Sequence, residues 1–236
     1  MSTETLLHLE GVHTFIGQFH ILQGVSMEVP AGEVTVLLGR NGAGKTTTLR
    51  TILGLWQPAQ GEIRFLGQPI GWRKPFEIVQ LGIGYVPEHR AVFRQLTVAE
   101  NLRVAERARG QLESRKAFLF DLFPDLERLY HWPGGQLSGG QQQMLAIARA
   151  LVPENRLLLI DEPSEGLAPV VIEQLMRAIR RLSGEVTVLL VEQNFRVASR
   201  LGAHYTIIED GRSVHSGAMR DLTASPETIQ RYLGAA

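Results

Sequence analysis

The chain is notable first for what it lacks. It contains no cysteine, which excludes disulfide bridges and thiolate metal sites. Its 24 Lys and Arg residues are balanced by 24 Asp and Glu residues, which argues against a nucleic-acid-binding surface. The longest apolar runs, such as 157–160 and 186–191, are far shorter than the ~20 residues of a membrane-spanning helix. Residues 1–15 have no basic stretch and no apolar core, so no secretory signal is expected. Such a chain would serve a membrane only by docking to a protein embedded in it.

The pattern of apolar residues predicts one α/β domain with an inserted lobe, because 236 residues are too few for two such domains. Residues 5–38 are β-rich, and apolar segments such as 34–38 and 157–160 are typical of strands buried on both faces. Strands alternate with helical segments, which predicts a mostly parallel sheet covered on both faces. From about 88 to 135 the pattern is helical, and Thr97 with Glu100 predicts a capping box at the start of a helix over 98–109.

A complete phosphate-binding pattern, Gly-x-x-x-x-Gly-Lys-Thr, lies between a predicted buried strand and a predicted helix over 46–55. Its glycines allow backbone N–H groups to point inward around an anion, and the helix N-terminus adds its positive end. Lys45 is expected to reach the β- and γ-phosphates of ATP, and Thr46 to ligate Mg²⁺. The alternative is a glycine-rich turn without a ligand. The predicted nucleotide-binding residues here are Gly39, Arg40, Asn41, Gly42, Ala43, Gly44, Lys45, Thr46 and Thr47.

Two adjacent carboxylates, Asp161 and Glu162, end the apolar strand that begins at Leu157. Two adjacent carboxylates at the end of an apolar strand are expected where a cation or a substrate binds them. Asp161 would hold Mg²⁺ directly or through water, and Glu162 would polarise the attacking water. The alternative is an ordinary strand end that enters solvent.

A second candidate phosphate site is the sequence LSGGQ, at residues 137–141. Two glycines after Ser138 leave the first helical turn open to a phosphate, whose charge the helix dipole favours. Because the chain already has one phosphate cradle, a second is most useful on a partner's nucleotide. A glycine-containing N-cap explains Ser138 but not the second glycine. The predicted residues are Ser138, Gly139, Gly140 and Gln141.

Together these motifs resemble the ATP-binding cassette (ABC) ATPases, over essentially the whole chain. The resemblance implies a P-loop (RecA-like) α/β core with an antiparallel β subdomain and an inserted α-helical subdomain. It implies one domain over 1–236, with the core in 1–87 and 150–236 and the helical subdomain at about 88–149. Two cassettes would pair head to tail, each ATP lying between one P-loop and the other chain's LSGGQ. Residues 163–167 would cross the interface between them.

A finer resemblance is to the F-type ATPase subunits of branched-chain amino-acid importers and of their urea or amide relatives. It is carried by VPEHR (86–90), LTVAENL (96–102), DEPSEGLAP (161–169) and VEQN (191–194). The P-loop sequence favours the urea branch, whereas SEGLAP favours the amino-acid branch. The resemblance implies a second, different ATPase subunit, two membrane permease subunits and an extracytoplasmic solute-binding protein. It places the chain at the cytoplasmic face of the membrane as a peripheral subunit.

Three positions depart from most cassettes. Glu88 replaces a glutamine and is expected to ligate Mg²⁺; the alternative is a surface glutamate beside Arg90. Gln193 replaces a histidine that contacts the γ-phosphate, and it cannot carry that residue's positive charge. Ile16 occupies the place of an aromatic residue that stacks on adenine. The neighbouring Phe15 is predicted to belong to the core; the alternative is that it stacks on adenine, which requires a shift of the strand register.

Two classes of function follow. In the first, ATP binding and hydrolysis by Lys45, Glu162 and Gln193 drive a transport motor. In the second, the chain is a nucleotide-gated clamp with weak hydrolysis, an interpretation motivated by Gln193 and Ile16. An exporter subunit is a further alternative, because the membrane subunits set the direction of transport.

Overall fold

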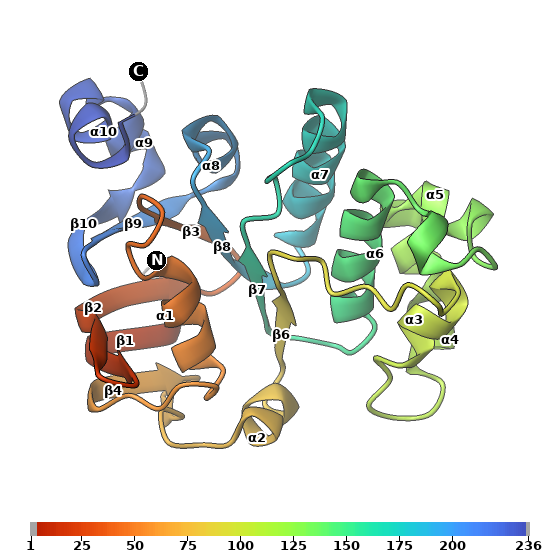
Figure 1. Ribbon diagram of the computed structural model, residues 1–236, viewed down its shortest axis with the longest axis horizontal. Coiled ribbons are helices and arrows are strands. Elements are labelled where there is room, and N and C mark those ends of the chain that lie inside the picture. Colours follow the sequence, from red (N-terminus) through yellow and green to blue (C-terminus); the bar gives the residue numbers. More distant parts are fainter. Residues whose placement is uncertain (1–3, 235–236) are drawn as a thin grey trace.

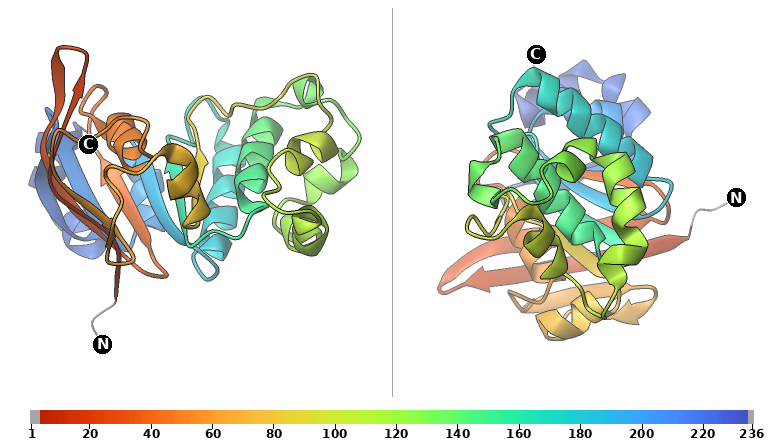
Figure 2. Two further views of the ribbon diagram at one scale, coloured as in Figure 1. Left: turned by 90° about the horizontal axis from the view of Figure 1, so that it is seen from below. Right: turned by 90° about the vertical axis from the view of Figure 1, so that its right-hand side faces the viewer.

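The computed structural model describes residues 4–234, so the predicted domain limits at residues 1 and 236 lie outside the described residues. The described chain has two lobes (Figures 1 and 2), one built on two sheets and the other from helices. The antiparallel sheet has the order β2 (Phe19–Pro30), β1 (Thr5–Ile16), β4 (Gln60–Phe65) and β5 (Gln68–Pro69). The larger sheet has the order β10 (Arg212–Ala218), β9 (His204–Glu209), β3 (Val34–Leu38), β8 (Thr187–Glu192), β7 (Leu157–Asp161) and β6 (Ile83–Val86). All its neighbouring strands are parallel except β9 and β10.

Helices cover the larger sheet and make up the second lobe. The sheet is flanked by α1 (Lys45–Ile52), α2 (Pro75–Gln80), α7 (Pro169–Leu182), α8 (Phe195–Leu201), α9 (Met219–Thr223) and α10 (Pro226–Leu233). The helical lobe contains α3 (Val98–Arg103), α4 (Gln111–Leu122), α5 (Pro124–Arg128), a short 3₁₀ turn (Gly134–Gln136) and α6 (Gly139–Leu151). The chain enters the helical lobe after β6 and returns from it into β7, and these two strands are neighbours at one edge of the larger sheet. The helices therefore form an insertion into the α/β core.

The core has two parts, one on each face of the larger sheet. Every residue of β3 is buried, and successive side chains alternate between the two faces. Val36 and Leu38 belong to the cluster that includes α6 to α8, whereas Leu37 belongs to the cluster that includes α1 and the antiparallel sheet. This explains why residues 34–38 are apolar apart from Thr35, which is also buried.

Predicted and observed elements agree closely where local signals are strong. The strand at 34–38 has the predicted limits. Thr97 and Glu100 form the predicted capping box, with the Thr97 N–H donating to Glu100 Oε2 at 2.7 Å. The sequence interpretation missed α2, β10, α9, α10 and the short 3₁₀ turn.

Two helices end earlier than predicted. Helix α1 ends at Ile52 rather than Leu55, because Gly54, at φ 69°, donates to Thr51 O while Leu55 donates to Arg50 O. These two bonds are the Schellman motif, which closes a helix through a left-handed glycine.

Helix α3 ends at Arg103, although a helix over 98–109 was expected. The N–H groups of Arg107 and Ala108 both donate to the Gln111 side-chain oxygen, at 2.7 and 3.1 Å, instead of to carbonyls of the preceding turn. Gln111 is the first residue of α4, so its side chain directs the chain into the next helix.

The capping box at Thr97 generates a stability prediction. The Thr97→Ala variant should lower the free energy of unfolding by about 1 kcal/mol, because it removes the hydroxyl that accepts from the Glu100 N–H. The matched control is Thr223→Ala, since the Thr223 hydroxyl is exposed and donates only to Arg220 O. Urea unfolding should place the control within about 0.5 kcal/mol of the wild type. Equal losses in both variants would contradict a special role for the box.

Candidate nucleotide site

The loop between β3 and α1 has the shape of an anion cradle. Gly39 and Gly44 have φ values of 154° and 109°, conformations that favour glycine. A Cβ on Gly39 would stand 2.4 Å from the carbonyl oxygen of Ile208, and one on Gly44 would stand 2.9 Å from a methyl group of Leu22. Helix α1 begins immediately after this loop, so its N-terminus faces the place where a phosphate would lie.

Lys45 connects this loop to the end of β7. Its side chain is only 4 % exposed. Nζ donates to Gly39 O at 2.9 Å and to Arg40 O at 3.1 Å, and it lies 3.0 Å from Glu162 Oε1. The ammonium group is therefore held at the mouth of the cradle, and a bound phosphate would compete with Glu162 for it.

Asp161 is fully buried at the end of β7. Its carboxylate accepts hydrogen bonds from the Thr46 hydroxyl at 3.2 Å and from the Tyr85 hydroxyl at 3.3 Å. Burial, together with the charges of Glu162 and Glu88, raises the pKa of Asp161 to about 6. Burial and the Asp161 charge raise the pKa of Tyr85 to about 12. No ion pair within residues 4–234 includes Asp161. A buried carboxylate beside a threonine hydroxyl is a suitable ligand set for a hard cation such as Mg²⁺.

The LSGGQ segment begins α6, away from the P-loop. Figures 1 and 2 show α1 and α6 apart, with β6 and β7 between them. Ser138 caps α6: the Gln141 N–H donates to its hydroxyl at 3.3 Å, and its own N–H donates to Gln141 Oε1 at 2.9 Å. The chain thus does not bring its own Ser138 to its own Lys45.

The second glycine of this segment has a packing explanation. A Cβ on Gly140 would stand 2.6 Å from a methyl group of Val171 on α7. Close approach of α6 and α7 therefore accounts for Gly140 within one chain. The role of Gly139, Gly140 and Gln141 in binding a partner's nucleotide stays a prediction.

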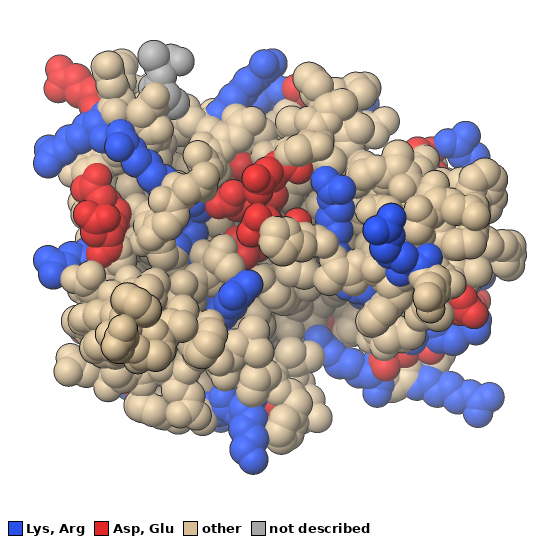
Figure 3. Space-filling view, in the orientation of Figure 1, with Lys and Arg blue, Asp and Glu red and all other residues tan. Residues whose placement is uncertain are grey.

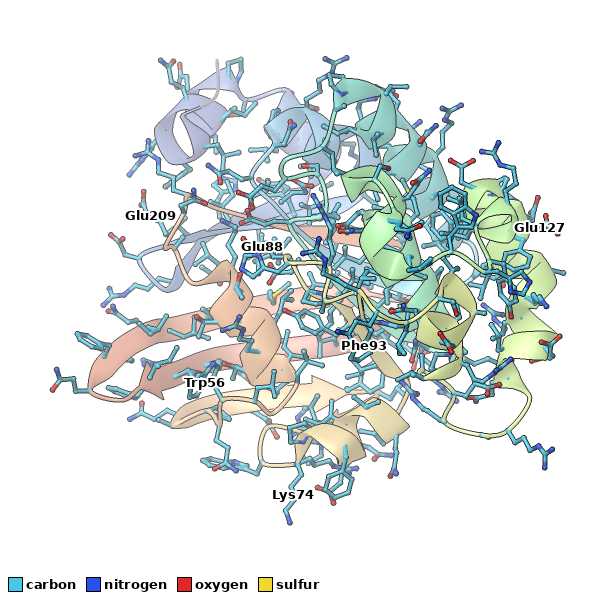
Figure 4. The ribbon with its side chains drawn as sticks, turned by 45° about the vertical axis from the view of Figure 1, so that its right-hand side comes forward. Trp56, Lys74, Glu88, Phe93, Glu127 and Glu209 are labelled. Atoms are coloured by element: carbon cyan, nitrogen blue, oxygen red, sulfur yellow. The ribbon has the colours of Figure 1, made fainter. Side chains whose placement is uncertain are left out.

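Glu88 and Gln193 both lie near the carboxylates. Glu88 is half-buried on the loop that leaves β6 (Figure 4), and its charge contributes to the raised pKa of Asp161. Gln193 is exposed just after β8, where it lines a pocket with Glu162, Glu165 and Glu192. Acidic side chains also gather near the centre of the face in Figure 3. The geometry thus brings Lys45, Thr46, Asp161, Glu162, Glu88 and Gln193 into one region.

Ile16 and its neighbour lie at the tip of the β1–β2 hairpin. Ile16 is half-buried and pairs with Phe19. The prediction that Phe15 belongs to the core is wrong, because its side chain is 45 % exposed and stacks on His20 with ring centroids 4.2 Å apart. The hairpin projects beyond the rest of its lobe (Figure 2), so a side chain at its tip has no core to enter.

Two polar residues of this region, the half-buried Tyr85 and the buried Glu192, escaped the sequence interpretation. Tyr85 lies near the end of β6 and Glu192 at the end of β8, each within a short apolar strand. A polar group at the carboxyl end of a parallel strand is the signal that could have found them, because these ends meet at one edge of the sheet.

Comparison with known proteins decides the family. The family described as "ABC transporter" matches residues 22–165, more than half of the chain. The chain belongs to the ABC transporter family.

Individual ABC transporter relatives match nearly the whole chain. It is 42 % identical to the high-affinity branched-chain amino acid transport ATP-binding protein BraG of Pseudomonas aeruginosa, over 97 % of this chain and 100 % of BraG. It is 30 % identical to BraF of the same organism, also a high-affinity branched-chain amino acid transport ATP-binding protein, over 98 % of each chain. A crystal structure of the ADP conformation of an ABC transporter cassette superposes with a TM-score of 0.88 and 25 % identity, over 99 % of this chain and 100 % of the other.

These findings confirm the predicted ABC ATPase fold and make the chain an ATP-binding ABC transporter ATPase, which hydrolyses ATP. Within residues 4–234, no helix combines the length and the apolar character needed to cross a membrane.

The buried Asp161 generates a prediction about pH. Its pKa is higher in the folded chain, about 6, than its ordinary 3.8. Ionisation therefore destabilises the metal-free fold progressively as the pH rises through this window, and the whole cost is present above it. The Asp161→Asn variant removes this cost, so without Mg²⁺ and nucleotide it should be about 3 kcal/mol more stable than the wild type at about pH 8.

Urea unfolding at several pH values checks this, with Asp221→Asn, at an exposed position, as the control. The gain from Asp161→Asn should shrink as the pH falls below about 6, where the wild-type carboxyl is protonated. A gain that is independent of pH, or a loss of stability at high pH, would contradict the account.

Proposed function

We propose that this chain is the ATP-hydrolysing subunit of an importer of branched-chain amino acids. The observation that carries the proposal is the grouping of Lys45, Asp161 and Glu162 at the mouth of the phosphate cradle. The similarity to BraG, whose name states branched-chain amino acid transport, supports the choice of solute.

Each group near the cradle has a task in this proposal. Lys45 would bind the terminal phosphates of ATP and thereby release Glu162, which would accept a proton from the attacking water. Thr46 and Asp161, with Glu88, would hold Mg²⁺, which when bound neutralises charge on the phosphate oxygens. Gln193 would donate a hydrogen bond to the γ-phosphate.

The remaining contacts to ATP are proposed from sequence position. Ile16 would pack on the adenine ring. The residues that would surround the phosphates are Gly39, Arg40, Asn41, Gly42, Ala43, Gly44 and Thr47.

A second cassette completes the site in this proposal. Because α1, which begins at Lys45, lies apart from α6, which Ser138 caps (Figure 1), LSGGQ of a partner would cover the ATP held by this chain. The chain is similar to both BraG and BraF of one organism, which supports a pair of different ATPase subunits. Two permease subunits and an extracytoplasmic binding protein would complete the importer, with this chain at the cytoplasmic face of the membrane. The helical insertion, proposed at about 88–149, would contact the permease.

The departure at Gln193 generates a prediction about turnover. Gln193→His should raise kcat for ATP roughly tenfold, because a protonated imidazole donates a charge-assisted hydrogen bond to the γ-phosphate. Gln193→Asn serves as the matched control, since its shorter amide carries no charge. Steady-state phosphate release measures both rates. Unchanged or lower turnover in Gln193→His would show that the missing charge does not limit this site.

Uptake in cells tests the function and the solute together. Cells lacking this gene should lose uptake of labelled leucine and regain it with the wild-type chain but not with Lys45→Ala. Lys74→Ala, which alters an exposed lysine far from the cradle (Figure 4), should restore uptake fully.

The same cells, given labelled urea, separate the alternatives. Loss of urea uptake with normal leucine uptake would show that the chain serves a urea importer. Normal uptake of both solutes would contradict the importer and favour an exporter or a nucleotide-gated clamp.

A further inference from the structure

Glu192 is a buried acid with no part in the proposed mechanism. It is the last residue of β8 and only 1 % exposed. Burial, together with the nearby charge of Glu162, raises its pKa to about 7. No ion pair within the described part of the chain includes it. A carboxyl group in such a place needs a structural or a chemical reason, because its desolvation is unfavourable.

The two oxygens of Glu192 join two loops. Oε1 accepts a hydrogen bond from the Ser164 N–H at 3.3 Å, and Oε2 accepts one from the Asn194 N–H at 3.2 Å. Ser164 follows Glu162 on the loop after β7, and Asn194 follows Gln193 on the loop after β8. One side chain thus connects the segments that carry the proposed proton acceptor and the proposed γ-phosphate donor.

The first of these segments is conformationally strained. Glu162 has a φ of 41°, in the left-handed region that residues other than glycine seldom adopt. Such a conformation persists only when the surrounding structure holds it in place. The Glu162 N–H donates to Val191 O at 3.0 Å, and two residues later Ser164 is bound by Glu192. Two hydrogen bonds therefore attach the turn at Glu162 to the end of β8, one at Glu162 itself and one two residues later.

We propose that Glu192 is a positioning residue for ATP hydrolysis. Through Ser164 it fixes the turn that aims the Glu162 carboxylate, and through Asn194 it fixes the backbone beside Gln193. The inference rests on the proposed role of Glu162 and adds the residue that holds it in place.

A carboxylate suits this task better than an amide. An ionised carboxylate accepts through both oxygens, whereas glutamine has one acceptor oxygen and would direct an NH₂ group at the other N–H. The charged groups that line the same pocket as Glu192 are Glu162 and Glu165. Lys45 lies one contact further away, since it pairs with Glu162. Protonation of Glu192 likewise removes one acceptor, so the ionised form is the one that holds both loops.

The test compares Glu192→Gln with the wild type in steady-state ATP hydrolysis on both sides of neutral pH. We expect kcat to fall about tenfold or more, since one charge-assisted hydrogen bond is lost from the turn. KM for ATP should change less than about twofold, because neither Lys45 nor the cradle contacts Glu192. Above neutral pH the deficit should be largest, and the rise of kcat as Glu192 ionises should be absent from the variant.

Two further variants make the outcome decisive. Glu185→Gln changes an exposed glutamate beyond the other end of β8 and should behave as the wild type. Glu162→Gln defines the rate without the proposed proton acceptor. A wild-type kcat in Glu192→Gln at every pH would overturn the inference, and so would a variant whose only defect is a lower melting temperature. If the wild type itself is no faster than Glu162→Gln, it is instead the proposed role of Glu162 that fails.

Discussion

The buried ammonium group of Lys45 is the contact on which the rest of the site depends. It ties the P-loop carbonyls of Gly39 and Arg40 to Glu162, at the end of a strand more than a hundred residues further along the chain. A buried cation needs oxygen partners, so the loop, β7 and the glutamate must come together for the fold to tolerate it. A phosphate offers the same cation a stronger set of oxygens. Without a nucleotide, the ion pair between Lys45 and Glu162 holds the site together, and a bound phosphate would break that pair.

The two-lobed shape is the physical basis of the proposed second cassette. The parallel sheet gathers Lys45, Asp161 and Glu162 at the carboxyl ends of its strands, whereas LSGGQ begins a helix of the inserted lobe. Packing accounts for Gly140 within the chain, since a side chain there would collide with Val171. Glycine at both 139 and 140 leaves the start of α6 without side chains. A surface of this kind suits the proposed contact with a partner's nucleotide.

How much of this could be predicted depends on how local the cause is. The caps at Thr97 and Ser138 depend on residues three positions away and were predictable from the sequence. The buried strand at 34–38 could be predicted because four of its five residues are apolar, with only Thr35 polar. The Schellman motif at Gly54 that ends α1 is also local, so the sequence could have predicted the end of this helix.

Other features depend on contacts between distant segments. Phe15 is exposed because its hairpin extends past the core, which no local pattern reveals. Tyr85 meets Asp161 across two neighbouring strands, and Glu192 meets Ser164 across 28 positions. These residues become visible only once the order of strands is known, because that order decides which strand ends are neighbours.

The central claim is that phosphate replaces Glu162 as the partner of Lys45. The most direct measurement is a crystal structure of the wild-type chain with Mg²⁺ and a non-hydrolysable ATP analogue. The account predicts that Lys45 Nζ contacts oxygens of the terminal phosphates and that the Glu162 carboxylate has left it. A bound analogue with the pair between Lys45 and Glu162 still intact would contradict the account.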